Sequence, residues 1–196
     1  MKQLVLASNN PGKIREIGAI LAPLKIEVIP QSHFNIPEAE EPHGTFIENA
    51  LAKARHAAAG SGLPALADDS GICVDVLDGA PGVHSARFAG EPKSDQRNNQ
   101  RLLELLVRSD NRKAHYYCVI VLLLHADDPQ PLIAEGEWHG EVLRAPRGSG
   151  GFGYDPLFLD PLLGQTGAEL PMEQKNRISH RGKALALLVQ RLGTAR

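Results

Sequence analysis

The stretch from which we interpret this chain runs Ala67-Asp68-Asp69-Ser70-Gly71. It places two adjacent carboxylates and a hydroxyl between two apolar runs, residues 63–67 and 72–77. Such oxygen-rich positions suit Mg²⁺, which usually joins one or two protein carboxylates to the phosphates of a substrate. Because Asp, Ser and Gly are also common turn residues, an acidic turn between two strands is the alternative interpretation. Taken alone, the pentapeptide favours the turn, so the surrounding sequence has to decide.

The composition is that of an ordinary folded protein, with 42% hydrophobic and 22% charged residues in 196. This length fits one large domain or two closely joined lobes. The formal net charge of −2 argues against a nucleic-acid polymer as partner, because such proteins normally carry a basic excess. Cys73 and Cys118 provide neither a disulfide framework nor a zinc spacing. No apolar run is long enough for a signal peptide or a membrane span, so we expect a cytoplasmic protein with no membrane partner.

Apolar periodicity predicts alternating strands and helices. Strands are expected at residues 4–7, 26–29, 72–76, 116–124, 132–138 and 141–143, the last two joined by a tight turn at His139-Gly140. Helices are expected at residues 13–24, 45–59 and 168–178, after Ser94, and after Ser179. The second of these helices opens with the capping box Thr45-Phe46-Ile47-Glu48 and ends at Gly60 and Gly62. In the helix after Ser94, the stripe that contains Asn99 indicates core packing only.

A polar loop joins the first predicted strand to the first predicted helix, with the sequence Ser8-Asn9-Asn10-Pro11-Gly12-Lys13. A loop that opens a helix presents backbone N–H groups and the positive end of the helix dipole, which together bind anions. Lys13 adds a positive charge there. The loop is not a P-loop, because the Walker spacing is absent and Ile14 follows the lysine. A plain strand–helix turn is the alternative.

Further carboxylates and a cation lie between residues 38 and 53. Glu38, Glu40 and Glu41 form an acidic loop that is either solvated or supplies a metal ligand, and their residue type does not rank them. Lys53 lies on the helix that follows, one turn from Asn49, where both side chains can point into a cleft.

A glycine-rich loop follows the last long strand. Residues 148–153 match G-x-G-x-x-G, but Tyr154-Asp155-Pro156 comes next, and a residue before proline is disfavoured in a helix. We therefore reject a dinucleotide site, which needs a helix at this point. Phe152 instead suits a planar base, because an aromatic face stacks on any base. A flexible hairpin with Phe152 in the core is the alternative.

The last predicted helix carries two cations in its first turn, His180 and Arg181. Cations at a helix N-terminus oppose the macrodipole, and a local rule broken in this way points to function. An exposed arginine on a tolerant surface is the alternative.

Seven motifs in this order closely resemble the inosine/xanthosine triphosphate pyrophosphatase family, whose members remove deaminated purine nucleotides. They are Ser8-Asn-Asn-x-x-Lys13, Gly44-Thr-Phe-x-Glu-Asn-Ala-x-x-Lys53-Ala, Ala67-Asp-Asp-Ser-Gly71, Gly79-Ala-Pro-Gly82, Ser85-Ala-Arg87, Gly150-Gly-Phe-Gly-Tyr-Asp155 and Ser179-His-Arg181. Each motif is weak by itself, whereas the seven in order are highly specific. The resemblance covers residues 4 to about 192.

The resemblance implies an α/β fold in which a mixed, elongated central sheet is flanked by helices and two lobes enclose the active-site cleft. It implies that residues 1–196 form a single two-lobed domain and that the protein is a homodimer. The implied activity is Mg²⁺-dependent hydrolysis of ITP, dITP and XTP to the monophosphate and pyrophosphate.

Position by position, the resemblance assigns Asp69 as general base and Glu40 and Asp69 as ligands of Mg²⁺. Ser70 touches the substrate, and Asp68 and Glu48 are secondary candidates. The phosphates are assigned to Ser8, Asn9, Asn10, Pro11, Gly12, Lys13 and Lys53. The base is assigned to Phe152, Gly153, Tyr154, Asp155, Lys175, His180 and Arg181.

Two rival functions stay open at this point. One is a pyrophosphatase for modified pyrimidine triphosphates, against which the Phe152 loop and His180-Arg181 favour purines. The other is a nucleotide sensor without turnover, against which the close spacing of Asp68, Asp69 and Ser70 argues.

Overall fold

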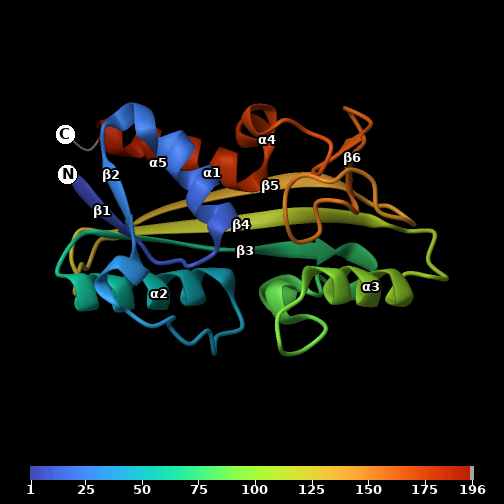
Figure 1. Cartoon of the computed structure of the whole chain (residues 1–196), viewed down its shortest axis with the longest axis horizontal. Helices are drawn as coiled ribbons and strands as arrows, with labels where there is room; N and C mark the ends of the chain where they lie inside the picture. Colours follow the sequence, from blue (N-terminus) through green and yellow to red (C-terminus); the bar gives the residue numbers. More distant parts are fainter. Residues whose placement is uncertain (195–196) are drawn as a thin grey trace. The chain divides into compact units, whose positions relative to one another are not determined.

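The computed structural model describes residues 1–194 of the chain (Figure 1). These residues form a mixed sheet flanked by helices, which confirms the predicted α/β fold. The strands are β1 (Gln3–Leu6), β2 (Glu27–Pro30), β3 (Ala65–Val74), β4 (Lys113–Leu123), β5 (Leu132–Val142), β6 (Phe158–Asp160) and β7 (Gln165–Thr166). The α-helices are α1 (Pro11–Leu21), α2 (Phe46–Ser61), α3 (Asp95–Leu105), α4 (Met172–Ile178) and α5 (His180–Thr194).

Backbone hydrogen bonds join the described strands in the order β2-β1-β3-β4-β5-β6-β7. Strand β1 pairs in parallel with β2 and with β3, whereas β6 pairs antiparallel with β5 and with β7. The parallel pairs occur where a helix separates consecutive strands, as parallel connections require. Of the antiparallel pairs at the other edge, β6 and β7 are joined by a short connection, residues 161–164, whereas residues 143–157 join β5 to β6.

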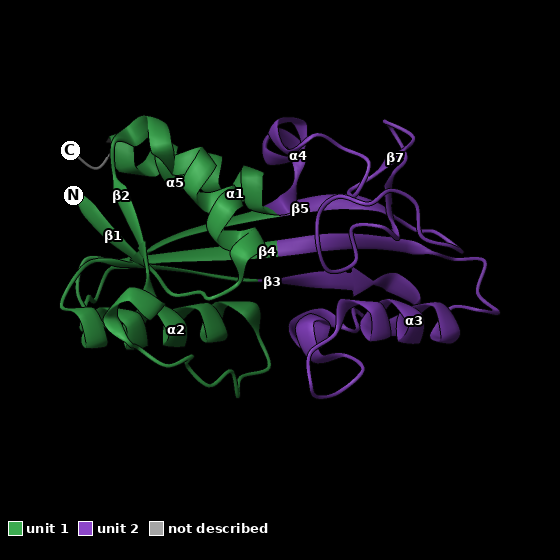
Figure 2. Ribbon diagram, viewed as in Figure 1, with its two compact units in different colours: residues 1–69, 118–136, 181–196 green, residues 70–117, 137–180 purple. Residues whose placement is uncertain are grey.

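The described chain divides into two compact units (Figure 2). Unit 1 comprises residues 1–69, 118–136 and 181–194, and unit 2 comprises residues 70–117 and 137–180. Strands β3, β4 and β5 each begin in one unit and end in the other. The boundary on β3 therefore falls between Asp69 and Ser70.

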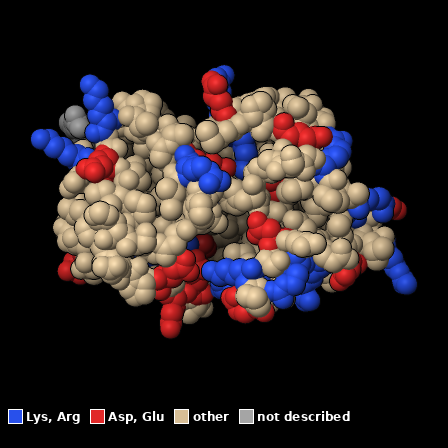
Figure 3. Space-filling view, in the orientation of Figure 1, with Lys and Arg blue, Asp and Glu red and all other residues tan. Residues whose placement is uncertain are grey.

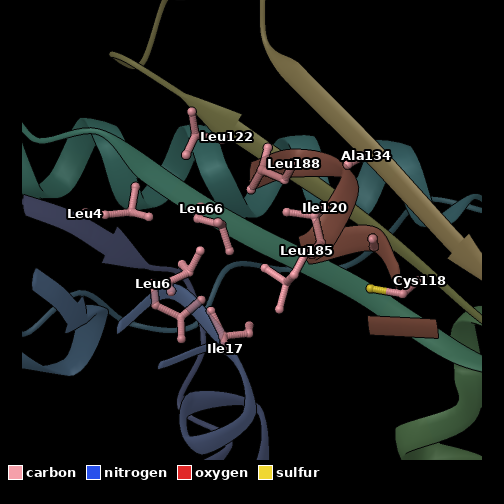
Figure 4. Close-up of a cluster of buried hydrophobic side chains, with 12 residues drawn as sticks. Leu4, Leu6, Ile17, Leu66, Cys118, Ile120, Leu122, Ala134, Leu185 and Leu188 are labelled. Carbon is pink, nitrogen blue, oxygen red and sulfur yellow. The ribbon is translucent and has the colours of Figure 1, made fainter. Parts of the chain in front are cut away.

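Unit 1 is built around apolar side chains from both its strands and its helices (Figure 4). Leu4, Leu6 and Leu66 of the strands pack with Ile17 of α1 and Leu185 of α5. In Figure 1, α1 and α5 lie on one side of the unit 1 strands and α2 lies on the other. Because successive residues of a strand face opposite ways, each strand supplies apolar side chains to both layers.

Helix α2 begins where the sequence predicted, but it continues through Gly60 to Ser61 and ends at Gly62. The Thr45 hydroxyl caps its first turn by accepting a hydrogen bond from the Glu48 backbone N–H, and Gly62 ends it with φ +69°. Ala50, Ala54 and Ala57 are among its buried residues.

Unit 2 has an aromatic core. The rings of Tyr116, Trp138 and Phe158 contact one another, with centroids 4.7 Å apart for Tyr116–Phe158 and 4.9 Å for Trp138–Phe158. The Trp138 indole N–H donates to the Asp160 carboxylate at 2.8 Å, which satisfies both buried polar groups.

Strand β5 corrects one prediction from the sequence. The expected tight turn at His139-Gly140 is absent, and residues 132–142 form one continuous strand. A side chain at Gly140 would lie 2.3 Å from the Leu159 carbonyl oxygen and 2.7 Å from the Phe158 ring. The glycine is therefore explained by the close approach of β6 and not by a turn.

Strand β3 corrects a second prediction from the sequence. Residues 65–74 form a single strand, so the acidic stretch lies in mid-strand and makes no turn. Asp68 and Asp69 are 1% and 6% exposed, which is unusual for carboxylates without compensating cations. The turn preferences of Asp, Ser and Gly gave the wrong prediction. The cations that compensate Asp68 and Asp69 come from other parts of the chain, which local preferences do not describe.

The charged surface shows no large area of a single sign on the face drawn in Figure 3, where acidic and basic side chains are interspersed. None of the helices within residues 1–194 is long and apolar enough to cross a membrane.

Candidate functional site

The loop before α1 is organised by its own side chains. The Asn10 side-chain oxygen accepts hydrogen bonds from the N–H groups of Gly12 and Lys13, at 2.8 and 3.2 Å. The Ser8 hydroxyl oxygen accepts from the Asn10 N–H at 3.2 Å, and Pro11 starts the helix. Asn10 is thus an N-cap, a role for which asparagine is well suited. An anion bound here would have to compete with the Asn10 side chain for two of the N–H groups.

A buried ionic cluster links this loop to β3 and α5. The Lys13 ammonium lies 3.0 Å from one oxygen of Asp68, and Arg181 donates to the other oxygen from Nε and Nη2 at 3.2 and 3.0 Å. The Nη1 group of Arg181 donates to the Glu16 carboxylate. Burial alone would raise the pKa of Asp68, but Lys13 and Arg181 outweigh it and hold that pKa well below its usual range. Asp68 is therefore a fixed anion that orients Lys13.

A second cation, Lys53 of α2, lies between two carboxylates. Its ammonium is 2.8 Å from Asp69 Oδ1 and 2.8 Å from Glu41 Oε1. Burial would lower the pKa of Lys53, but the attraction of Asp69 and Glu41 raises it above its ordinary value. The lysine is consequently charged, and it fixes Oδ1 of Asp69.

Asp69 keeps its other oxygen uncommitted. Asp69 Oδ2 is buried and has no hydrogen-bond partner within residues 1–194. Burial raises the pKa of Asp69, against the opposing pull of Lys53 and Lys13. A carboxylate with a raised pKa is a stronger base, and an unpaired buried oxygen is costly unless a ligand satisfies it. These two properties are those of a reactive group.

The carboxylates of Asp69 and Glu41 fit a Mg²⁺ site that takes only one or two ligands from the protein. No cluster of three His, Cys, Asp or Glu side chains suited to a metal is found among the described residues. The unpaired Oδ2 of Asp69, with the Glu41 carboxylate on the same lysine, supplies hard oxygen donors. Mg²⁺ typically takes one or two carboxylates and completes its octahedron with water and substrate phosphates. Of the acidic loop, the structure places Glu41 beside Lys53, whereas Glu40 is exposed.

We call residues 151–155, Gly151-Phe152-Gly153-Tyr154-Asp155, the aromatic loop. The Asp155 carboxylate accepts from the Phe152 N–H at 2.9 Å and from the Lys175 ammonium at 2.6 Å. The Lys175 nitrogen also lies 4.8 Å from the centre of the Phe152 ring, a cation–π distance. A side chain at Gly151 or Gly167 would clash with Asp155, at 2.1 and 2.8 Å. The glycines therefore make room for the carboxylate that shapes the loop.

The rest of the aromatic loop is anchored to other parts of unit 2. The Tyr154 hydroxyl donates to the Ser85 carbonyl at 2.8 Å, and burial raises the pKa of that hydroxyl. Gly153 is bonded to Asp95 and Asn99 of α3.

His180 and Arg181 occupy different environments although they are neighbours. The His180 ring stacks on Tyr116, with centroids 4.5 Å apart and planes 7° apart. Arg181 is only 2% exposed, and its guanidinium donates to Asp68 and Glu16. A base that bound Arg181 directly would have to compete with these carboxylates.

The structure thus collects the assigned residues into two groups. Unit 1 contains Ser8, Asn9, Asn10, Pro11, Gly12, Lys13, Glu40, Lys53, Asp69 and Arg181. Unit 2 contains Ser70, Phe152, Gly153, Tyr154, Asp155, Lys175 and His180.

Among the residues in these contacts, the sequence assigned no site role to Glu16, Glu41, Asp95 and Asn99. Glu16 could have been suspected, because it lies four residues after Gly12 on the same helical face. Glu41 could not be separated from its neighbours by residue type. Asp95 and Asn99 carry no local sign of their contacts with a loop more than 50 residues away.

The chain is similar to known proteins over nearly its whole length. A curated protein of Aromatoleum aromaticum named dITP/XTP pyrophosphatase is 67% identical over 193 residues, covering 98% of both chains. One of the same name from Nitrosomonas europaea is 64% identical, covering 98% of this chain and 95% of its own. The solved structure of a HAM1 protein from Coxiella burnetii matches with a TM-score of 0.91 and 49% identity, over 99% of this chain and 100% of that one.

The model of the Ham1 family matches residues 4–191, nearly the range over which the seven motifs occur. These matches confirm the resemblance drawn from the motifs, and the chain belongs to the Ham1 family.

Proposed function

We propose that this chain is a nucleoside-triphosphate pyrophosphatase that hydrolyses non-standard purine triphosphates, among them ITP, dITP and XTP, to the monophosphate and pyrophosphate. The observation that carries the proposal is Asp69, a buried carboxylate with one oxygen fixed by Lys53 and the other unpaired. The name dITP/XTP pyrophosphatase of relatives 67% and 64% identical supports both the hydrolysis and the substrate class.

The phosphates are held by cations and by the loop before α1. Lys13 and Lys53 are both anchored by carboxylates, so their ammonium groups are presented in fixed positions. Ser8, Asn9, Asn10, Pro11 and Gly12 line the start of α1, where the positive end of the helix dipole favours an anion. Phosphoanhydride hydrolysis depends mainly on positioning and charge neutralisation, which this arrangement supplies.

Asp69 acts as the general base. It accepts a proton from the attacking water, while Lys53 keeps the carboxylate oriented through Oδ1. Ser70, the next residue on β3, contacts the substrate beside it.

Asp69 would also hold Mg²⁺ with a glutamate of the acidic loop. The resemblance assigns Glu40, and the position of Glu41 beside Lys53 makes it the second candidate. When bound, Mg²⁺ neutralises phosphate charge.

The base is recognised by the aromatic loop and its neighbours. Phe152 stacks on the purine while Gly153, Tyr154, Asp155 and Lys175 fix its surroundings, and His180 and Arg181 complete the assigned set. Hypoxanthine and xanthine carry a 6-oxo acceptor where adenine carries a 6-amino donor. A protein donor placed for the oxo group would face another donor in ATP, which costs about 1–3 kcal/mol, or roughly 5- to 150-fold.

The first test is product analysis with ITP, XTP, GTP and ATP in the presence of Mg²⁺. We expect pyrophosphate from ITP and XTP and little reaction with ATP. Orthophosphate as the product, or equal rates for all four, would refute the reaction or the specificity. Pyrophosphate from modified pyrimidine triphosphates in preference to ITP would favour the rival substrate class.

The second test is Asp69→Asn, which should lower kcat by roughly 10²- to 10⁴-fold while nucleotide binding persists. Asp75→Asn, on an exposed residue of the same part of the chain, is the matched control and should retain wild-type kcat. Near wild-type turnover by Asp69→Asn would remove Asp69 from the role of base.

We also propose a single domain that acts as a homodimer. Light scattering of the purified chain tests the assembly, and a monomer at micromolar concentration would contradict it.

A further inference from the structure

Gly153, the residue after Phe152, is held at both of its backbone polar groups by one helix. The Gly153 N–H donates to the Asp95 carboxylate at 2.7 Å. The Gly153 carbonyl accepts from the Asn99 side-chain N–H at 2.9 Å. Asp95 and Asn99 are four residues apart on α3, so they lie on the same face of the helix. Their spacing lets Asp95 bind the N–H group of Gly153 while Asn99 binds its carbonyl group.

Helix α3 is itself fixed in unit 2. The Ser94 hydroxyl caps its N-terminus by accepting from the Arg97 N–H at 3.3 Å. Asn98, between the two contacts to Gly153, accepts from the Ala89 N–H at 2.7 Å and donates to the Ala86 carbonyl at 3.0 Å. The helix is therefore a rigid support for the aromatic loop.

The aromatic loop needs such support because of its glycines. Phe152 lies between Gly151 and Gly153, whose φ angles are +71° and +61°. Glycine adopts many backbone conformations in an isolated loop, so the direction of the Phe152 ring would be poorly defined. Asp155 fixes the N–H of Phe152, and α3 fixes the peptide groups on its other side.

We propose that Asp95 and Asn99 are positioning residues for base recognition, which hold Phe152 in the orientation that stacks on a purine. The inference rests on the proposed function, in which Phe152 contacts the base. A ring already oriented loses less conformational freedom when it binds, so the two residues increase affinity without touching the substrate. The two residues affect binding of the base only. The phosphate contacts, which come from Lys13 and Lys53, stay unchanged.

The test separates binding of the base from binding of the phosphates. The variants are Asp95→Ala and Asn99→Ala, and the probes are inosine monophosphate, by calorimetry, and inorganic tripolyphosphate, as a competitive inhibitor. Each variant should weaken binding of the monophosphate and raise the KM for ITP roughly three- to tenfold, the effect of one hydrogen bond, with kcat unchanged. Inhibition by tripolyphosphate should stay at the wild-type level.

Conservative variants distinguish positioning from general damage. Asp95→Asn keeps an acceptor for the Gly153 N–H and should restore affinity for the monophosphate. Asn99→Asp places a carboxylate against the Gly153 carbonyl and should weaken that affinity more than Asn99→Ala. Gln100→Ala, an exposed residue of the same helix whose side chain bonds only to Glu104 among the contacts described, is the matched control and should behave as wild type.

Two results would overturn the inference: unchanged affinity for the monophosphate in the combined variant Asp95→Ala, Asn99→Ala, or equal losses for the monophosphate and tripolyphosphate. Both probes bind without turnover, so this outcome is separate from the proposed reaction. A wild-type chain that binds inosine monophosphate but releases no pyrophosphate from ITP would refute the proposed reaction and leave the positioning role standing. A wild-type chain that does not bind the monophosphate would refute the positioning role, whereas pyrophosphate release from ITP still decides the proposed reaction.

Discussion

Replacing Arg181 by methionine should destabilise the fold by about 3–5 kcal/mol, the usual cost of removing one partner from a buried ion pair. Arg181 is 2% exposed and compensates two carboxylates, Asp68 and Glu16. In the variant, the Lys13 ammonium would still lie 3.0 Å from Asp68 and compensate its charge. The loss of stability should therefore be at the lower end of that range. For a chain of this length, 3 kcal/mol corresponds to a fall in Tm of roughly 6–12 °C.

The assay is urea unfolding at pH 7 followed by circular dichroism, with thermal scans in parallel. The matched control is Arg177→Met, because Arg177 pairs with Glu173 one turn away while both are mostly exposed, at 72% and 82%. Exposed pairs of this kind contribute only a few tenths of a kcal/mol. Glu16→Gln combined with Arg181→Met should cost less than the sum of the single changes, because residues in contact are not additive.

A loss below about 1 kcal/mol in Arg181→Met, or one no larger than in Arg177→Met, would refute the reasoning from burial. Additive effects of Glu16→Gln and Arg181→Met would show that the two side chains do not interact. Activity gives a second readout, since the resemblance to the family assigns Arg181 to the base. If Arg181 contacts the base, the variant loses more activity with ITP than with ATP. If it acts only through Asp68 and Glu16, both activities fall by the same factor.

Two further predictions concern stability. Arg147 lowers the pKa of Glu169 from 4.5 to about 2, so the stabilisation by this group is complete above 4.5 and is lost as the pH falls from there towards 2. Glu169→Gln should therefore lose less stability than wild type between pH 6 and pH 3 in urea unfolding, and an equal loss would contradict the assignment. A side chain at Gly71 would lie 2.3 Å from the Gly82 carbonyl oxygen, whereas at Gly18 of α1 it meets nothing within 4 Å. Gly71→Ala should thus lower the Tm, and Gly18→Ala should raise stability by roughly 0.5–1 kcal/mol; the opposite order of the two Tm values would refute the packing argument.

Much of the local structure follows from the sequence. The capping box at Thr45 and the glycine at Gly62 set both ends of α2, and the apolar periodicity of residues 14–21 predicted most of α1. These features depend on residues within one or two turns of each other, whose hydrogen bonds and packing are decided locally. The seven ordered motifs also identified the family, because together they are specific even though each is weak.

The tertiary structure alone decided how the buried charges are compensated. Arg181 reaches Asp68 across 113 residues of sequence and Glu16 across 165, and Lys53 reaches Asp69 across 16. These cations let β3 continue through its two carboxylates. The contacts of α3 with Gly153 span 54 and 58 residues. A buried charge is stable only if an opposite charge is delivered to it, and which distant side chain does so depends on how the elements pack. Residue preferences describe only a neighbourhood of the chain, so from the acidic pentapeptide alone they predicted a turn where the folded protein has a strand.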